Sequence, residues 1–453
     1  MLKAIDLKKD SIIKLFFNFS IPSVTGMMVT ALYAIVDGIF IGRGVGANGL
    51  AAVNIAYPVI NLGTAISLLI GTGGATLMSL RPKNIKFKNT CFSHIILLNI
   101  IFYLITLIVV FITGDRLIYL LGANDLLASQ VKIYLYTCVI AMIFLMLSNS
   151  LNAVVRNDKS PMYAFIAMVI GALTNVFLDW LFIIVFPWGV FGGAFATAIG
   201  QLLSFLFLVK YFYRIDCKIK FKIKKLKYIF VKNIFSIGFP SFTIEFTAAL
   251  TNTLFNISFM KYLGEIGVSA YSIVAYICFI FRSLFTGLAQ GIQPIVSYNY
   301  GAKEYQRVKS TFKIGHIITL IISTTILLWV IFLGKYLVIM FNDEPNLVKL
   351  ASHGLILFAS AIIFQGANFI NISYLQSKGM TKLSNLISSL RSIVFLIISI
   401  TILPIFLRED GVWLSLPASD FMCFIVSIII LRKELPFSFK FPKKKEKKKF
   451  INL

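Results

Sequence analysis

The sequence predicts an all-α, polytopic membrane protein with twelve transmembrane helices in two pseudo-symmetric six-helix bundles. Composition is the first reason: 58% of the 453 residues are hydrophobic and only 13% are charged, with a mean hydropathy of +0.88. Soluble domains carry roughly 25% charged residues, so this composition fits a lipid bilayer. The other two reasons are the number of long apolar runs and an internal repeat.

Twelve apolar runs are long enough to cross the hydrocarbon core, which takes about 20 helical residues. Because lipid offers no partner to backbone N–H and C=O groups, each run is predicted to be a helix. The expected spans are 15–41, 51–79, 91–112, 132–155, 162–186, 190–212, 230–260, 268–298, 312–333, 350–376, 382–406 and 411–431.

The two halves of the chain repeat one another at an offset that drifts slowly along the sequence. Pro22 aligns with Pro240, and Gly46 aligns with Gly264 at the same offset. Six spans are an even number, so both halves enter the membrane in the same direction, which predicts a parallel repeat as in many secondary transporters. The expected parts are a first bundle with an ion-coupling site (1–215), a basic linker (216–229), a second bundle (230–435) and a Lys-rich tail (436–453).

The distribution of basic residues predicts the orientation. If the N-terminus is cytoplasmic, only seven of the 43 Lys and Arg residues fall in outward loops, and two, Arg282 and Arg391, fall within spans. Short cytoplasmic loops are enriched in Lys and Arg, so both termini are expected in the cytoplasm of a multi-pass plasma (inner) membrane protein. This placement explains the net charge of +25 without nucleic acid, and makes anionic lipid the expected partner of the basic clusters.

Neither cysteines nor histidines suggest a cofactor. The five cysteines are scattered and the three histidines are isolated, so no metal site and no cofactor are expected; the positions are Cys91, Cys138, Cys217, Cys278, Cys423, His94, His316 and His353.

Four acids fall inside the predicted spans: Asp37, Asp179, Glu245 and Asp420. An ionisable group at that depth costs several kcal/mol unless it faces a cavity or a partner, so a functional role is its default interpretation. At about 1.5 Å per residue, Asp37 and Asp179 both lie roughly 8–10 Å below the outer surface. Asn175 precedes Asp179 by one helical turn and shares its face.

Desolvation and mutual repulsion make it costly for two carboxylates in one poorly hydrated pocket to be ionised together. Asp37 and Asp179 are therefore expected to bind a proton near neutral pH. The same oxygens are also suited to Na⁺ together with backbone carbonyls. The plain alternative is a protonated acid that hydrogen-bonds to Asn175 and has no further role.

The acids of the second half leave more alternatives open. Glu245 lies near the midplane, where it suits a second coupling ion, a cationic substrate, or an ion pair with Arg282 or Arg391. Asp420 has the same two candidate partners.

Four segments carry a family resemblance. ALYAIVDGIFIGRGVGANGLAAVNIAYP (31–58) resembles the first two helices of the multidrug and toxic compound extrusion (MATE) family. GLAQGIQPIVSYNYGAKEYQRVK (287–309) is similar to the eighth span of its DinF-like and MepA-like bacterial branch. LTNVFLDWLFI (173–183) and GVFGGAFATAIGQ (189–201) resemble the fifth and sixth helices.

This resemblance implies a V-shaped pair of bundles that exports amphipathic, often cationic compounds in exchange for H⁺ or Na⁺. It implies a first-bundle ion-coupling site at Asp37, Asn175, Asp179 and Thr197. A second candidate site, for an ion or for substrate, comprises Glu245, Gln290, Gln293 and Arg282. The helix-ten acid of Na⁺-coupled relatives has no equivalent here, where that helix offers Gln365, Asn368 and Asn371, and this favours the first-bundle site.

The predicted function is therefore a secondary antiporter for drugs or xenobiotics that works by alternating access, as a monomer and not as an enzyme. A flippase for a lipid or a lipid-linked oligosaccharide is the main alternative, but only Arg282 and Arg391 are available as central cations. An intramembrane enzyme is the remote alternative, since it needs acid–base clusters on larger loops than these.

Overall fold

The computed structural model describes residues 5–215, 217–222 and 225–432, which fold almost entirely into helices. The predicted Lys-rich tail, 436–453, lies outside the described residues. The helices are α1 (Ile12–Gly44), α2 (Ala47–Ser79), α3 (Ile85–Thr113), α4 (Asp115–Leu120), α5 (Asp125–Asn157), α6 (Pro161–Asp179), η1 (Trp180–Val185), α7 (Gly189–Tyr211), α8 (Tyr228–Gly301), α9 (Tyr305–Ile339), α10 (Pro345–Ala359), α11 (Ala361–Ser377), α12 (Thr381–Ser389), η2 (Leu390–Val394) and α13 (Phe395–Leu431).

The predicted twelve spans are confirmed. Within the described residues, ten helical stretches are long and apolar enough to cross a membrane. Two of them are interrupted, at Gly264 (φ 65°, ψ −154°) and at Arg408 (φ 49°, ψ −127°), so each supplies two spans. Gly46, the repeat partner of Gly264, also has a positive φ of 91°. Glycine adopts this conformation at little cost, which explains why both halves place one between their first two spans.

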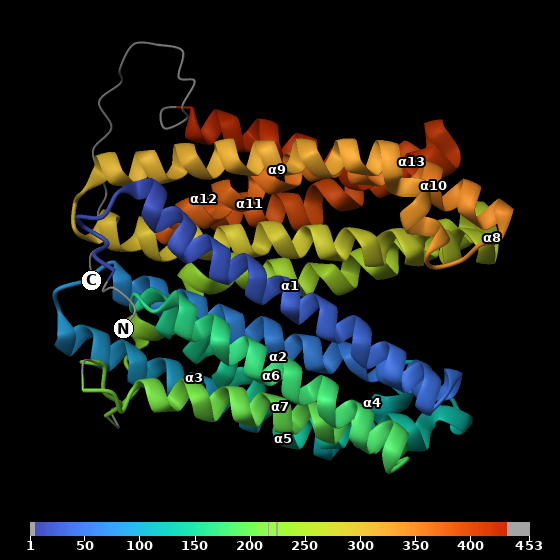
Figure 1. The fold of residues 1–453 in the computed structure, drawn as a ribbon, viewed down its shortest axis with the longest axis horizontal. Coiled ribbons are helices and arrows are strands. Elements are labelled where there is room, and N and C mark those ends of the chain that lie inside the picture. The colour runs from blue at the N-terminus through green and yellow to red at the C-terminus, as the bar shows by residue number, and fades with distance from the viewer. Residues whose placement is uncertain (1–4, 216, 223–224, 433–453) are drawn as a thin grey trace.

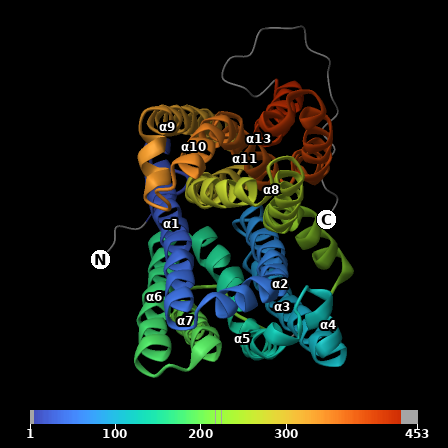
Figure 2. The ribbon, with the colours of Figure 1, turned by 90° about the vertical axis from the view of Figure 1, so that its right-hand side faces the viewer.

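The first seven helices form one bundle and α8 to α13 form the other, with their long axes nearly parallel (Figure 1). The end view separates the two groups, which meet where α2 of the first bundle faces α8 of the second (Figure 2). The described chain begins and ends at the same end of the molecule, which we call the terminal end.

Helix α1 belongs to both bundles and crosses obliquely between them (Figure 1). Near its start, Phe16 is part of the same apolar core as α8 and α9. Near its end, Gly44 packs so closely on the start of the α6–α7 connection that an added Cβ would lie 2.4 Å from Ile183 Cγ2. Pro22 lies between these two parts, where it removes a backbone hydrogen bond and permits a change of direction.

Glycines bring the two bundles into backbone contact at the terminal end. A Cβ on Gly238 of α8 would lie 1.8 Å from the carbonyl oxygen of Leu69 in α2. Gly291, in the second span of α8, packs on Ser20 of α1 in the same way. A Cβ added at Gly291 would lie 2.6 Å from the Cα of Ser20. Polar pairs join the same regions: the Thr72 hydroxyl donates to Ser241 Oγ at 2.8 Å. The bundles are therefore closed against each other at this end.

Replacing Gly238 by alanine is expected to lower the apparent melting temperature in detergent. The methyl group has to displace the backbone of α2, and overpacking of this kind costs about 1–3 kcal/mol. Gly42→Ala is the matched control, because a Cβ at Gly42 meets nothing within 4 Å and alanine favours a helix. Equal melting temperatures for Gly238→Ala and the unmodified chain would contradict the close contact.

Candidate functional site

The first-bundle residues predicted from the sequence lie together. Asp37 comes from α1, Asn175 and Asp179 come from the last turns of α6, and Thr197 comes from α7. The Asn175 amide donates to Thr197 Oγ1 at 3.2 Å, and the carboxyl groups of Asp37 and Asp179 lie close enough to interact electrostatically. Asp179 is 0% exposed and Asn175 is 3% exposed.

Several acceptor oxygens of this cluster have no hydrogen-bond donor. Four of its buried oxygens have no hydrogen-bond partner: Asp37 Oδ1, both carboxylate oxygens of Asp179 and Asn175 Oδ1. Among the ion pairs of the described residues, none reaches Asp37 or Asp179. A buried acceptor without a donor costs about 1–3 kcal/mol, and more if it is charged. The arrangement therefore favours uptake of a proton or of a small cation that prefers oxygen ligands.

Sequence analysis missed three side chains beside this cluster. Tyr33, one helical turn before Asp37, and the buried pair Tyr134 and Cys138 of α5 lie close enough to interact electrostatically with the cluster. Tyr33 could have been found from the sequence, because its spacing of four residues from Asp37 places both side chains on the same face of α1. Nothing local marks the α5 residues, because their proximity depends on how α5 packs.

A π-helical turn, η1, begins directly after Asp179. Such turns add a residue to the helical repeat and are frequent at functional sites. Here the turn changes the direction of the side chains that follow Asp179, and the Trp188 N–H closes it by donating to Phe182 O at 2.8 Å.

A second group of predicted residues lines a pocket between the bundles, next to the closed terminal end. Glu245, Gln290 and Gln293 all line this pocket, whose empty volume, including the solvent space at its opening, is about 480 Å³. Arg282 is not among its lining residues. Across the pocket floor, the Gln293 amide donates to Thr76 Oγ1 at 2.7 Å.

The suggested ion pairs of Glu245 are wrong. Among the described ion pairs, neither Arg282 nor Arg391 lies within 4.0 Å of this carboxylate. The Arg282 guanidinium instead lies 5.6 Å from the ring centroid of Phe279. Glu245 therefore lines the pocket without a neutralising side chain.

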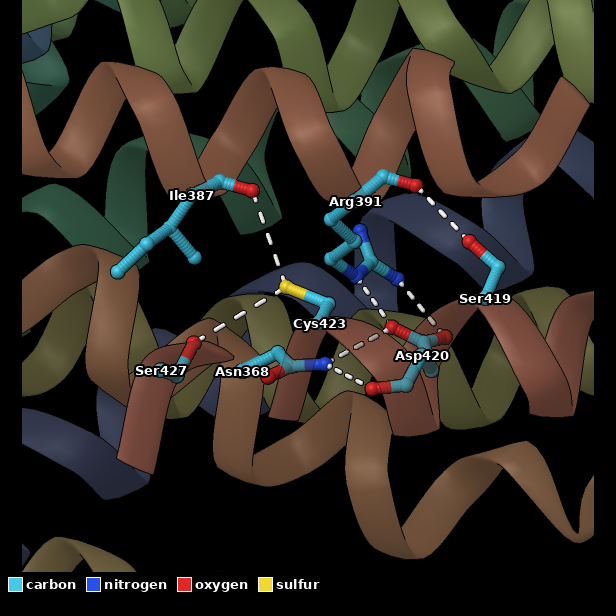
Figure 3. Close-up of polar contacts among 7 residues, drawn as sticks. All are labelled: Asn368, Ile387, Arg391, Ser419, Asp420, Cys423 and Ser427. Carbon is cyan, nitrogen blue, oxygen red and sulfur yellow. Dashed lines mark hydrogen bonds and ion pairs between the residues drawn. The ribbon is translucent and has the colours of Figure 1, made fainter. Parts of the chain in front are cut away.

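Asp420 pairs with Arg391, which decides between its two candidate partners (Figure 3). Arg391 Nε lies 2.5 Å from Asp420 Oδ1, and Nη2 lies 3.3 Å from Oδ2. Asn368 of α11 donates to the backbone oxygen of Asp420 at 2.8 Å, and the Ser419 hydroxyl donates to Arg391 O at 3.1 Å. The carboxylate is only 1% exposed, and Arg391 lies in the second π-helical turn, η2.

Breaking this pair is expected to destabilise the second bundle. Asp420→Ala leaves a buried, unpaired guanidinium at a cost of about 3–5 kcal/mol, so the melting temperature in detergent should fall clearly. The double change Arg391→Met with Asp420→Leu removes both charges and is expected to recover most of the loss. A double variant that melts no higher than the single one would show that charge pairing is not the stabilising factor.

Twelve spans in two bundles, a buried carboxyl cluster in one bundle and a pocket between the two define a polytopic membrane protein with the architecture of secondary transporters. The chain matches the MatE family model over residues 22–181 and 240–401, and it belongs to this family, that of multidrug and toxic compound extrusion. The second match begins 218 residues after the first, which agrees with the internal repeat.

Relatives cover nearly the whole chain. Multidrug export protein MepA of Staphylococcus saprophyticus is 24% identical over 431 residues, 94% of each chain. MepA of Staphylococcus aureus is 23% identical over 428 residues, again 94% of each. These relatives are transporters and not enzymes.

Two solved structures have the same fold. An outward-facing multidrug resistance MATE transporter of the MOP superfamily superposes with a TM-score of 0.89 at 20% identity, covering 96% of this chain and 98% of that one. The MATE multidrug transporter DinF-BH, solved in complex with a ligand, superposes with a TM-score of 0.87 at 27% identity, with the same coverage.

Proposed function

We propose that this protein is a secondary antiporter that exports amphipathic or cationic drugs or xenobiotics in exchange for H⁺. The observation that carries the coupling is the Asp37–Asp179 pair, two neighbouring carboxyl groups with buried, unbonded oxygens and no ion-pair partner among the described residues. The multidrug exporters among its relatives support the substrate class. Transport requires no cofactor and no nucleic acid in this proposal, and one chain with two bundles suffices as a monomer.

The orientation follows from the charges. With the terminal end in the cytoplasm of a plasma (inner) membrane protein, most Lys and Arg residues lie on the cytoplasmic side, next to anionic lipid. With the terminal end closed on the cytoplasmic side, we propose that this is an outward-facing state, in which the pocket with Glu245 is reached from the outside.

Protons reach the pair from the outside in this state. Protonation of Asp37 and Asp179 removes the charge that keeps the cluster hydrated and allows α1 to repack on α6 and α7. Because α1 also contacts the second bundle, its movement changes the pocket and favours substrate release. Loss of the proton to the cytoplasm resets the cycle. The proton drives export only because it binds the two states with different affinity.

Na⁺ is the alternative coupling ion. The oxygens of Asp37, Asp179, Asn175 and Thr197 make a donor set that a hard cation accepts. Helix α11 offers amide side chains and no carboxylate for an equivalent site in the second bundle. One of these amides, Asn368, already donates to Asp420. Coupling through the first bundle alone is therefore the simpler scheme.

We assign Glu245 to substrate recognition. A carboxylate that lines a partly apolar pocket without an ion pair attracts organic cations, and the nearby Gln290 amide offers a polar contact. The flippase alternative is less favoured, because Arg391 is held by Asp420, and Arg282, the other candidate cation, is not among the residues that line the pocket.

Efflux of a cationic dye from proteoliposomes tests the coupling. Under a pH gradient alone, the unmodified chain is expected to export dye, and Asp37→Asn and Asp179→Asn are each expected to abolish export, because an amide cannot carry the proton. Export is followed by dye fluorescence, with protein amount checked in every sample.

The Na⁺ gradient is imposed separately as the comparison. Export under Na⁺ alone would replace the proton by Na⁺ in the scheme. Normal export by both asparagine variants would exclude the first-bundle site, and failure of the unmodified chain to export dye under both gradients would exclude antiport of such dyes.

Substitution of the pocket carboxylate separates cationic from neutral substrates. Glu245→Gln is expected to raise the half-saturating concentration of a monocationic dye about tenfold, equivalent to about 1.4 kcal/mol, with a smaller effect on an uncharged amphipathic one. Gln293→Glu makes the opposite change, since it adds a carboxylate to the same pocket, and it is expected to favour the cationic dye over the uncharged compound. Equal losses for both classes of substrate would argue against charge recognition by Glu245.

A further inference from the structure

We propose that Ile5–Asp10, the segment before α1, and Arg307 of α9 form a latch that holds the terminal end closed and must open in every transport cycle. The proposal rests on the alternating-access function proposed above. It concerns residues at the terminal end, away from both the carboxyl cluster and the pocket.

The latch segment is seated on the second bundle by one buried side chain. Leu7 is 0% exposed and packs in a small apolar cluster with Leu15 and Phe19 of α1 and with Ile295 of α8. Because Ile295 belongs to α8, this contact ties the segment to the second bundle.

Arg307 fastens the backbone of the same segment. Its Nη2 donates to the carbonyl oxygens of Leu7 and Asp10, at 3.1 and 2.6 Å. Its Nε donates to Asn299 Oδ1 at 3.1 Å, and the Asn299 amide in turn donates to Leu7 O at 3.1 Å. Charge-assisted bonds of this kind hold a fixed geometry, because the guanidinium fork is planar.

An ion pair adds a third contact on the surface. Lys8 Nζ lies 3.3 Å from Glu304 Oε1, in the turn between α8 and α9, and both side chains are partly exposed. An exposed ion pair contributes little stability, so this pair is not what holds the end closed. Its two positions are instead suited to the introduction of cysteines for cross-linking.

The latch is continuous with the helix that carries the ion-coupling carboxylate. Its segment leads into α1, whose first turns contact α8 through Ser20 and Gly291 and whose later part carries Asp37 in the first bundle. Opening the terminal end separates α1 from α8 unless α1 bends sharply at Pro22. If α1 separates from α8, the hydrogen bonds from Arg307 to the segment break in each cycle. If α1 bends at Pro22 instead, the segment stays bound to α8 and α9 throughout the cycle.

A reversible cross-link distinguishes these two cases. Lys8→Cys with Glu304→Cys, joined by a short bifunctional thiol reagent that a reductant cleaves, is expected to lose dye export when linked and to recover it on reduction. Export at the unlinked rate while the link is intact would overturn the latch. Each single cysteine variant receives the same reagent, which excludes an effect of modification alone.

The matched control is a second ion pair within the first bundle, at the other end of the molecule. Lys132 Nζ and Asp115 Oδ1 are 2.7 Å apart on α5 and α4, and both side chains are exposed. Linking Lys132→Cys to Asp115→Cys is expected to leave export unchanged. The reduced double variants also test antiport itself. If they and the unmodified chain export no dye, the proposed antiporter function is wrong. If export continues while the latch cross-link is intact, only the latch proposal is wrong.

A second variant tests the lock without a cross-link. In a Ser20→Cys background, Arg307→Gln is expected to speed labelling of this cysteine by a water-soluble thiol reagent several-fold, because Ser20 is 2% exposed and packs against Gly291 while the end is closed. Lys309→Gln, which removes a charge from an exposed position two residues along α9, is the control and is expected to have no effect. Unchanged labelling in Arg307→Gln would overturn its role in holding the end closed.

Discussion

A carboxylate buried in hydrocarbon needs a cation, a hydrogen-bond donor or a proton, and the two bundles of this protein meet that requirement differently. In the second bundle, Asp420 is neutralised within the protein by Arg391 and by the amide of Asn368. In the first bundle, Asp37 and Asp179 face each other with buried oxygens that lack donors. One site is thus complete, whereas the other is completed only by a bound proton or ion. This difference assigns coupling to the first bundle in our proposal.

Helix α1 connects that requirement to the rest of the molecule. Its later part carries Asp37 against α6 and α7, and its first part packs on α8 and α9. At Gly238 and Gly291 the backbone of the second bundle lies directly against the first, with no side chain of either glycine to adjust the distance. Interfaces of this type have a few discrete arrangements rather than a continuous range, so in our proposal a change at the carboxyl cluster is transmitted as a switch between states.

The pocket between the bundles has the chemistry of a broad binding site. It is lined largely by apolar and amide or hydroxyl side chains, with Glu245 as its one carboxylate among the described lining residues. One charge without a fixed partner selects for cationic compounds but imposes little on their shape, which fits the broad substrate class proposed here.

The sequence by itself determined the membrane class, the twelve spans and the repeat, because length, hydropathy and glycine or proline positions act locally. It also identified the acids of the spans and the common depth of Asp37 and Asp179, since helical rise converts residue number into depth. The resemblance to the MATE family is confirmed, while the assignment of coupling to these residues remains a prediction.

Only the tertiary structure decided which buried groups meet. It paired Asp420 with Arg391, left Glu245 without a cation, and brought Tyr134 and the segment before α1 to places that no local pattern marks. Hydropathy indicates that a residue lies in a membrane helix, but rotation and tilt of that helix are set by packing against its neighbours. Contacts between helices distant in sequence therefore depend on the whole set of packed surfaces, which the one-dimensional pattern does not contain.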